Sequence, residues 1–136
     1  MADLTRTDVI KLIAIATKPL DLLGVNLEGI DLTKLNLSKA NLRGANLEGA
    51  NLEGAKLKEA NLRGANLEGA NLKRASLGGA NLGLAKLSKA NLTLAWLGGA
   101  NLEKANLSKA NLEKAYLVDA DLSGANLEGI DGNYYI

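Results

Sequence analysis

Residues 40–69 read ANLRG ANLEG ANLEG AKLKE ANLRG ANLEG, and this five-residue pattern occupies most of the chain. Leu stands at every fifth position from Leu22 to Leu127, which makes 22 consecutive copies. With this Leu as the third residue of each pentad, the first residue is Ala from Ala40 to Ala125, and the second is Asn or Asp in 17 of the 22 pentads. The chain is therefore a tandem repeat, and its fold depends on how the repeat buries leucine.

A five-residue period fits neither an α-helix nor a straight strand. On a helix the leucines would be scattered round the axis, and on a straight strand successive leucines would point to opposite faces. Exposing so many leucines to water is unfavourable, so we expect the chain to turn a corner once per pentad. All 22 leucines then point inward together with the small first residue, while the second, fourth and fifth residues face outward.

Each corner is expected to be a β-turn with the fourth and fifth residues at its centre. A type II turn needs a positive φ at its second central residue, which favours glycine. Gly fills the fifth position in 11 of the 22 pentads, including Gly44, Gly49 and Gly64. The other corners carry Lys, Glu, Arg, Leu or Asp at this position, and for them we expect a different turn type without a positive φ.

Departures from the repeat indicate how many pentads make one coil. The second position is neither Asn nor Asp at Lys86 and at four residues spaced by 20, which are Lys56, Ser76, Trp96 and Tyr116. A coil of 20 residues contains four pentads and has a four-sided cross-section. The 22 pentads then form about 5.5 coils, which stack at about 4.8 Å, the spacing of paired strands.

The tandem A-[ND]-L-x-x pattern of residues 20–131 resembles that of the pentapeptide-repeat proteins. The resemblance implies an all-β fold, the right-handed quadrilateral parallel β-helix, and thus a handedness that the period alone does not show. Its near-perfect repeats are similar to those of members that are abundant in cyanobacteria.

Some members of this family imitate B-DNA and regulate a type II topoisomerase, DNA gyrase. Their rods are strongly acidic, often have Phe at the central position of the pentad, and in some cases contain loop insertions. This chain has Leu at every central position, no insertion in the repeat and a net charge of +1. We therefore expect a non-enzymatic structural or protein-interaction solenoid, and we keep the DNA-mimicking regulator as the disfavoured alternative.

Residues 1–19 lack the repeat and are expected to form an N-terminal helical cap. Thr5 and Asp8 resemble a capping box, and apolar residues follow at helical spacing: Val9, Leu12, Ile13 and Ala16. We expect a helix over residues 6–17, ended by Pro19, whose apolar face covers the first coil. A membrane-surface helix is the alternative, and it is disfavoured because the polar face is not basic.

Residues 132–136 form a C-terminal tail, which begins where Gly132 replaces the next leucine. Tyr134, Tyr135 and Ile136 are expected either to fold over the last coil or to contact a second molecule, and we favour the first. The protein is then a monomer or a weak end-to-end dimer.

Lys56, Ser76, Trp96 and Tyr116 should form one column and are a candidate interaction surface. Glycines flank the aromatic residues and keep the surrounding surface low. Exposed aromatic side chains on such a surface suit a protein partner. The alternative is that they stack as ordinary cross-strand pairs and have no partner.

Two other columns consist of like charges: Arg43 with Arg63, and Glu28 with Glu48 and Glu68. We interpret both as solvated surfaces produced by repeat duplication. The carboxylates have no expected pocket or converging neighbours, so they do not predict a glycosidase pair or a metal site.

The composition excludes several classes of function. The chain has no Cys and no His, so disulfides are impossible and the usual ligands of zinc and haem are absent. The near-zero net charge gives no attraction to nucleic acid or to an anionic membrane. We expect no catalytic residue, no cofactor and no metal, an unknown protein partner, and a cytoplasmic location.

Overall fold

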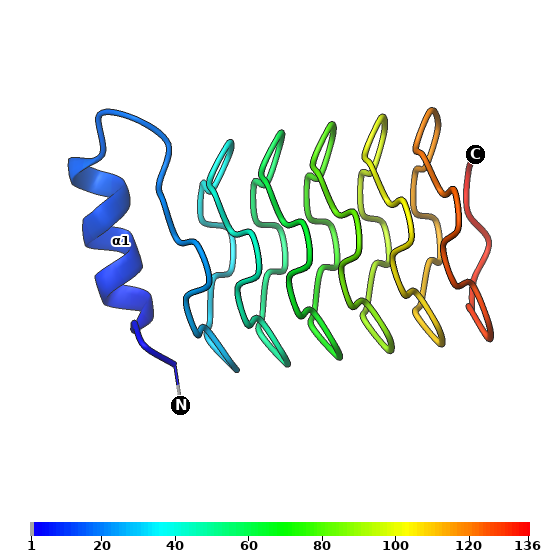
Figure 1. Ribbon diagram of the computed structural model, residues 1–136, viewed down its shortest axis with the longest axis horizontal. Helices are drawn as coiled ribbons and strands as arrows, with labels where there is room; N and C mark the ends of the chain where they lie inside the picture. The colour runs from blue at the N-terminus through cyan, green and yellow to red at the C-terminus, as the bar shows by residue number, and fades with distance from the viewer. Residues whose placement is uncertain (1) are drawn as a thin grey trace.

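The computed structural model describes residues 2–136 and shows one short helix followed by a regular solenoid (Figure 1). The helix, α1, spans Arg6–Ile15. After it, single parallel β-bridges join residues 20 apart, beginning with Asp21 and Asn41. Each side of a coil contributes one bridged residue, which is the second residue of its pentad. The four sides of every coil therefore stack in register on those of the next.

Backbone hydrogen bonds along the rod hold the coils together. The N–H groups of the third and fifth residues donate to the next coil, and that of the second residue donates to the preceding coil; the Leu62 N–H, for example, lies 2.7 Å from the Asn81 carbonyl oxygen. The first residue closes the corner, as the Ala65 N–H does by donating to the Leu62 carbonyl oxygen at 3.0 Å. Four of the five N–H groups are thus used by the backbone, and only that of the fourth residue depends on a side chain.

Leucine and alanine fill the interior of the solenoid. The third-position leucines from Leu22 to Leu117 and the first-position alanines from Ala40 to Ala115 are buried, and no polar residue of the described chain is buried with them. The expectation that all 22 leucines are buried is wrong for the last two, because Leu122 is half-buried and Leu127 is 37% exposed. These two lie in the last coil, which has no further coil stacked on it.

All corners have the same backbone conformation, which corrects the prediction for corners without glycine. The 11 non-glycine residues at the fifth position have φ between 56° and 62°, close to the 63° to 68° of the glycines at that position. The physical reason is the hydrogen-bond ladder, because the fifth N–H must reach the next coil whatever its side chain is. A left-handed conformation is unfavourable by about 1–2 kcal/mol for residues other than glycine, and the ladder imposes it nonetheless.

Helix α1 begins with a capping box. The Thr5 side-chain oxygen accepts from the Asp8 N–H at 3.2 Å, and the Asp8 carboxylate accepts from the Thr5 N–H at 2.8 Å. The helix ends two residues earlier than expected, because Ala16 is already extended, with φ −68° and ψ 129°. Within residues 2–136 no helix is both long enough and apolar enough to cross a bilayer.

Helix α1 lies beside the first coil (Figure 1). Val9 is fully buried, and Leu12 and Ile13 pack against the core. The first coil meets the helix with larger first-position residues than alanine: Leu20, Val25, Ile30 and Leu35. Arg6 adds an ion pair with Asp31 at 3.3 Å.

The C-terminal tail extends the ladder at Asn133, whose carbonyl oxygen accepts from the Lys114 N–H, and at Tyr135. The Tyr135 N–H donates to the Ala115 carbonyl oxygen at 2.9 Å, and the Tyr135 carbonyl oxygen accepts from Leu117 at 2.6 Å. Tyr134 and Ile136 line an apolar hollow of about 110 Å³ together with the last leucines. The exposed fractions of Tyr134, Tyr135 and Ile136 are 38%, 59% and 80%, so the tail covers this end incompletely.

Candidate interaction face

One side of the solenoid carries most of the departures from the repeat. Bridges align six residues along it, and we call this side the aromatic face: Asn36, Lys56, Ser76, Trp96, Tyr116 and Tyr135. The four residues singled out from the sequence thus form one column, and Tyr135 extends it. Sequence reasoning assigned Tyr135 only to the tail, because it follows Tyr116 by 19 residues rather than 20. The last pentad is one residue short, which hides the register.

Trp96 and Tyr116 stack on each other with their ring centroids 3.9 Å apart and their planes inclined by 7°. The bridge between them fixes this arrangement, and aromatic neighbours on a β-surface attract one another. Trp96 nevertheless keeps 51% of its surface exposed. A large apolar ring is thus held in one orientation and left accessible.

Gly78 and Gly98 provide the space in which these rings lie. Neither has a positive φ, unlike the corner glycines that follow them. A Cβ on Gly98 would lie 3.1 Å from Trp96 Nε1 and 3.2 Å from Tyr116 Cε1, and one on Gly78 would lie 3.3 Å from the indole. The rings therefore lean over the fourth-position backbone, and glycine is needed there for contact rather than for turn geometry.

Elsewhere on the solenoid, except at Lys86, the second-position side chain has a hydrogen-bonding role. Its Oδ1 accepts from the N–H of the fourth residue in the same pentad, as Asn91 does from Thr93 at 3.0 Å. From Lys56 to Tyr116 the aromatic face has no such oxygen in place. Within residues 2–136, four N–H groups on this face consequently find no acceptor: Lys58, Gly78, Gly98 and Val118. These residues are exposed or half-buried, so the four N–H groups face the surface.

Positive charge lies beside the aromatic rings. Lys56 and Lys58 are exposed, and in the described chain neither forms an ion pair. The neighbouring carboxylate of Glu59 lies 3.8 Å from the Lys39 ammonium group, and this ion pair partly neutralises the negative charge of Glu59. The aromatic face is therefore basic toward the helix and aromatic toward the C-terminal end.

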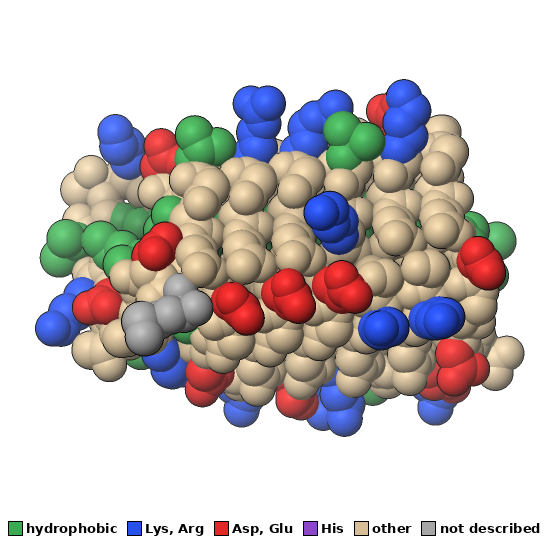
Figure 2. Space-filling model, turned by 60° about the horizontal axis from the view of Figure 1, so that its bottom comes forward, with side chains coloured by type: hydrophobic (Ala, Val, Ile, Leu, Met, Phe, Trp, Pro, Cys, Tyr) green, Lys and Arg blue, Asp and Glu red, His purple; other side chains and the backbone are tan. Residues whose placement is uncertain are grey.

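The columns of like charge form as expected but have no sign of a site. Figure 2 shows acidic side chains in a row along the rod, continued by basic ones. Bridges between Asn26, Asn46 and Asn66 place Glu28, Glu48 and Glu68 in successive coils. The Glu48 carboxylate accepts from Asn66 Nδ2 at 3.2 Å, a local contact on an open surface. Arg63 extends over Gly83, where a Cβ would lie 2.9 Å from its guanidinium.

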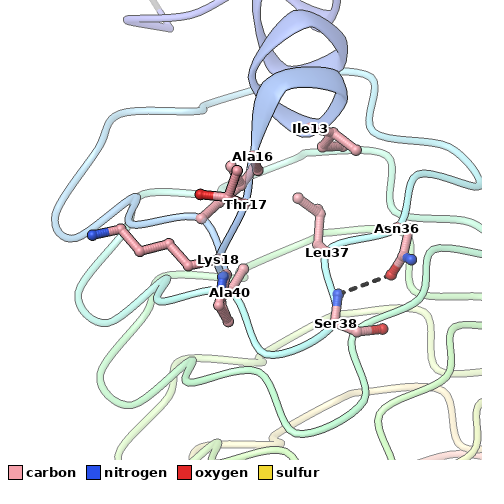
Figure 3. A pocket seen from close by; sticks show the side chains of 10 residues that line it. Ile13, Ala16, Thr17, Lys18, Asn36, Leu37, Ser38 and Ala40 are labelled. Atoms are coloured by element: carbon pink, nitrogen blue, oxygen red, sulfur yellow. Dashed lines mark hydrogen bonds between the residues drawn. The ribbon is translucent and has the colours of Figure 1, made fainter.

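A hollow of about 300 Å³ lies between the end of α1 and the first coil and is shown in Figure 3. Its wall is partly apolar, with Ile13 and Leu37, and partly polar, with Thr17 and Ser38. Within this wall the Ser38 N–H donates to Asn36 Oδ1 at 3.1 Å. Asn36 also begins the aromatic face, which therefore runs from this hollow to the C-terminal end.

Titratable groups within residues 2–136 show no arrangement typical of catalysis. The pKa values of Asp8, Asp31 and Asp121 are lowered, in each case mainly because Thr5, Thr33 or Ser123 donates hydrogen bonds to the carboxylate. These are turn and cap contacts on the surface. Across residues 2–136, Asp and Glu side chains form no cluster of three or more that could hold a metal ion.

Comparison with protein families now adds to this geometry. The model for pentapeptide repeats matches eight copies within residues 21–131. The chain belongs to the pentapeptide-repeat family. Proteins of this family form right-handed β-helices, so the handedness implied by the sequence resemblance applies to this chain. A search of curated protein sequences finds no significant match.

Several solved structures are similar to this pentapeptide-repeat protein. HetL, a pentapeptide-repeat protein involved in heterocyst differentiation regulation in the cyanobacterium Nostoc sp. strain PCC 7120, is 37% identical over 84% of the chain, with a TM-score of 0.61. The chain spans 64% of the HetL structure. The plasmid-mediated fluoroquinolone resistance protein QnrB1 is 22% identical over 85% of this chain and 66% of its own, with a TM-score of 0.62, and shares the fold. The similarity to a cyanobacterial member confirms the resemblance drawn from the sequence.

Membership of the pentapeptide-repeat family distinguishes the features that this chain shares with the repeat from those in which it departs from the repeat. The Leu and Ala core and the Asn side chains that accept from the fourth N–H belong to the repeat. The stacked aromatic pair, the glycines beneath it and the unpaired N–H groups are departures from the repeat. The aromatic pair, its glycines and four of the five unpaired fourth-position N–H groups of residues 2–136 share one face, and the fifth belongs to Ser88 on another side. This concentration makes the aromatic face the candidate functional site.

Proposed function

We propose that this chain is a non-enzymatic protein-interaction solenoid and that the aromatic face is the surface that binds a partner. The observation that carries the proposal is the exposure of Trp96, which keeps 51% of its surface accessible although stacking holds it in place. Tryptophan and tyrosine are enriched among residues that dominate binding energy at protein interfaces. A ring that is already ordered loses little conformational entropy on binding.

The competing interpretation is that the aromatic pair only stabilises the surface. Cross-strand aromatic pairs do contribute to stability, by roughly 0.2–1 kcal/mol. That gain accompanies the loss of the Asn hydrogen bond at both positions, which is worth roughly 1 kcal/mol each. Stability alone therefore does not favour Trp and Tyr over Asn here, and binding supplies the missing reason.

Capture of a partner from an extract of the organism that encodes the chain tests the proposal. The variant Trp96→Asn with Tyr116→Asn returns both positions to the repeat. It should lose the partner while keeping its melting temperature within a few degrees, because the backbone ladder is unchanged. Lys86→Asn makes the same kind of change on another side and is the control. Equal capture by all three proteins would contradict the proposal.

Regulation of a type II topoisomerase remains the alternative function. The fold is shared with QnrB1, but the net charge of +1 does not imitate DNA. We expect supercoiling by purified gyrase, with and without a fluoroquinolone, to be unchanged by the protein. Inhibition or protection at stoichiometric concentration would favour the alternative.

We also propose that any self-association is weak and uses the C-terminal end. Leu127 and Ile136 are exposed around the apolar hollow there, and a second molecule would cover them. Light scattering across a concentration series should show a monomer with a small dimer fraction. A variant without residues 133–136 should dimerise or aggregate more, since more of the last coil is then exposed. An unchanged monomer after this deletion would mean that the tail does not protect the end.

A further inference from the structure

The aromatic face contains a low stretch between its basic part and its aromatic part. Ser76 is bridged to Lys56 on one side and to Trp96 on the other, so one short side chain separates the two. Gly78 lies beside it in the same pentad and adds no side chain. We call this stretch, with Lys56, Lys58, Ser76, Gly78 and Trp96, the serine step. Lys56 and Trp96 are two coils apart across it, roughly 10 Å at strand spacing.

Hydrogen-bond donors gather at the serine step without acceptors. The N–H groups of Lys58 and Gly78 have no acceptor within the described chain. At a repeat position Asn would supply one, but Ser76 makes no such bond. The Trp96 indole borders Gly78, with Cδ1 and Nε1 each 3.3 Å from where a Gly78 Cβ would lie, but it offers no acceptor. The ammonium groups of Lys56 and Lys58 add positive charge that no ion pair neutralises in residues 2–136. Together these donors suit a carboxylate, which accepts charge-assisted hydrogen bonds from N–H groups.

The indole of Trp96 bounds the same step with an apolar plane. Tyr116 covers one side of the ring, at 3.9 Å between centroids. The neighbour on the other side is Ser76, which cannot stack, and half of the Trp96 surface stays exposed. An aromatic side chain entering from this direction would continue the stack by one ring.

We infer that the serine step binds an acidic segment of a partner protein in which a carboxylate adjoins an aromatic side chain. The carboxylate accepts from the backbone N–H groups of Lys58 and Gly78 and is attracted by the two lysines. The aromatic side chain stacks on Trp96. This inference rests on the proposed function of the aromatic face and specifies the chemistry of the partner there.

The same charges do not favour nucleic acid. Binding to a polyanion draws on many phosphate contacts, and this face has only two unpaired lysines beside Trp96. A short acidic peptide needs no more than these two lysines. Direct titration with the peptide and with single-stranded DNA therefore distinguishes the two kinds of ligand.

Trp96 is the single tryptophan of the chain and reports on the site without a label. We would titrate the protein with acetyl-Asp-Glu-Phe-Glu-Asp-amide and follow tryptophan emission, with binding measured in parallel by calorimetry. Binding should be saturable, and the emission maximum should shift as the ring becomes covered. The control peptide acetyl-Lys-Lys-Phe-Lys-Lys-amide should bind at least about tenfold more weakly, because its charge is reversed. Oligothymidylate should not compete.

Two pairs of variants separate the serine step from the rest of the surface. Ser76→Asn supplies an internal acceptor for the Gly78 N–H and should weaken peptide binding about tenfold, as expected for loss of one charge-assisted hydrogen bond. Lys86→Asn supplies the same acceptor for Ser88 on another side and should leave binding unchanged. Lys56→Glu with Lys58→Glu should abolish binding, whereas Lys86→Glu should not.

Each outcome decides one question. No saturable change with the acidic peptide, equal binding of both peptides, or tighter binding of oligothymidylate would overturn the inference. Loss of binding in Lys86→Glu would do so too, since it would indicate a general charge effect. The proposed function fails separately, if Trp96→Asn with Tyr116→Asn still captures the partner. Capture that depends on Trp96 without peptide binding would retain the proposed function and discard the acidic ligand.

Discussion

The aromatic face and the side that carries Asn51, Asn71, Asn91 and Asn111 are built on the same backbone ladder. We call the second side the asparagine column. In this column each side chain accepts from the N–H two residues later, as Asn91 does from Thr93 at 3.0 Å. On the aromatic face the corresponding donors are unpaired, while an indole and a phenol ring lie over glycine. The coil thus tolerates a complete change of surface chemistry without a change of backbone.

This comparison teaches that the core and the ladder determine stability, whereas the outer side chains can vary. The core and the ladder are identical beneath both sides, so each second-position side chain adds only a small stabilising contribution. The asparagine column makes that contribution through a local hydrogen bond. The aromatic face lacks this hydrogen bond from Lys56 to Tyr116. The following predictions test this division, from the largest expected effect to the smallest.

A charge in the core should be equally harmful beneath either side. Leu77 lies beneath the aromatic face and Leu92 beneath the asparagine column, and both are fully buried. Leu77→Lys and Leu92→Lys should each lower the free energy of unfolding by at least about 3 kcal/mol, because the ammonium group has no partner inside. Leu94→Lys, at an outward position that is 40% exposed, should have little effect in the same thermal melts. A large difference between the two core variants would mean that the two sides do not share one core.

The Asn side chain should be worth about 1 kcal/mol of unfolding free energy wherever it is present. Asn91→Ala should lose this amount in chemical denaturation, since the Thr93 N–H then has no acceptor. Ser76→Asn should gain a similar amount on the aromatic face, because it pairs the Gly78 N–H. If Ser76→Asn is neutral or destabilising, the contrast between the two sides does not arise from this hydrogen bond.

Contact between the rings and Gly98 should appear as a coupling energy. Gly98→Ala places a methyl group 3.1 Å from Trp96 Nε1, so the indole must shift. In a double-mutant cycle with Trp96→Ala, we expect coupling of about 0.5–1 kcal/mol, together with altered Trp96 emission in the single variant. Thr93→Ala, at the matching place in the asparagine column, provides the comparison and should show no coupling to Trp96. Zero coupling at Gly98 would mean that the rings do not rest on the backbone.

The smallest expected effect concerns pH. Asp121 takes the place of Asn at a second position, and Ser123 lowers its pKa from the ordinary 3.8 by donating two hydrogen bonds, the hydroxyl being the stronger influence. A lowered folded-state pKa stabilises the fold above the ordinary value, and this contribution is lost as the pH falls through the lowered value. Acid titration of the melting temperature should therefore show a small decline below pH 3.8 that Asp121→Asn reduces. An identical decline in both proteins would assign it to other carboxylates.

Much of the fold could be predicted from the sequence because the repeat is long and its side chains have clear preferences. Leu at every fifth position required a corner per pentad, and the 20-residue spacing of Lys56, Ser76, Trp96 and Tyr116 indicated which residues share a side. The same spacing identified the aromatic face as a candidate surface. The role of Asn as an acceptor for the fourth N–H was not foreseen, although Asn at a fixed place before a turn is a known signal for such a bond.

The wrong predictions concern residues whose type favours one conformation or burial while the neighbouring coils, or their absence, impose another. Lys, Glu and Leu at the fifth position predicted corners without a positive φ, yet Lys34, Glu59 and Leu84 have φ of 58° to 60°. The ladder outweighs their intrinsic preference, because abandoning it would leave hydrogen bonds of two coils unmade. Similarly, Leu127 has the residue type of the core and is exposed because no coil follows it.

The sequence by itself determined which side chains point inward, the length of a coil and the place of the helix, since these follow from periodicity and from local capping. Only the tertiary structure decided the conformation of the corners, the addition of Tyr135 to the aromatic face, the packing of Trp96 over Gly98 and the incomplete cover of the C-terminal end. Each of these depends on contacts between residues about 20 apart. A neighbouring coil imposes such contacts through hydrogen bonds and steric exclusion, and no five-residue pattern contains them.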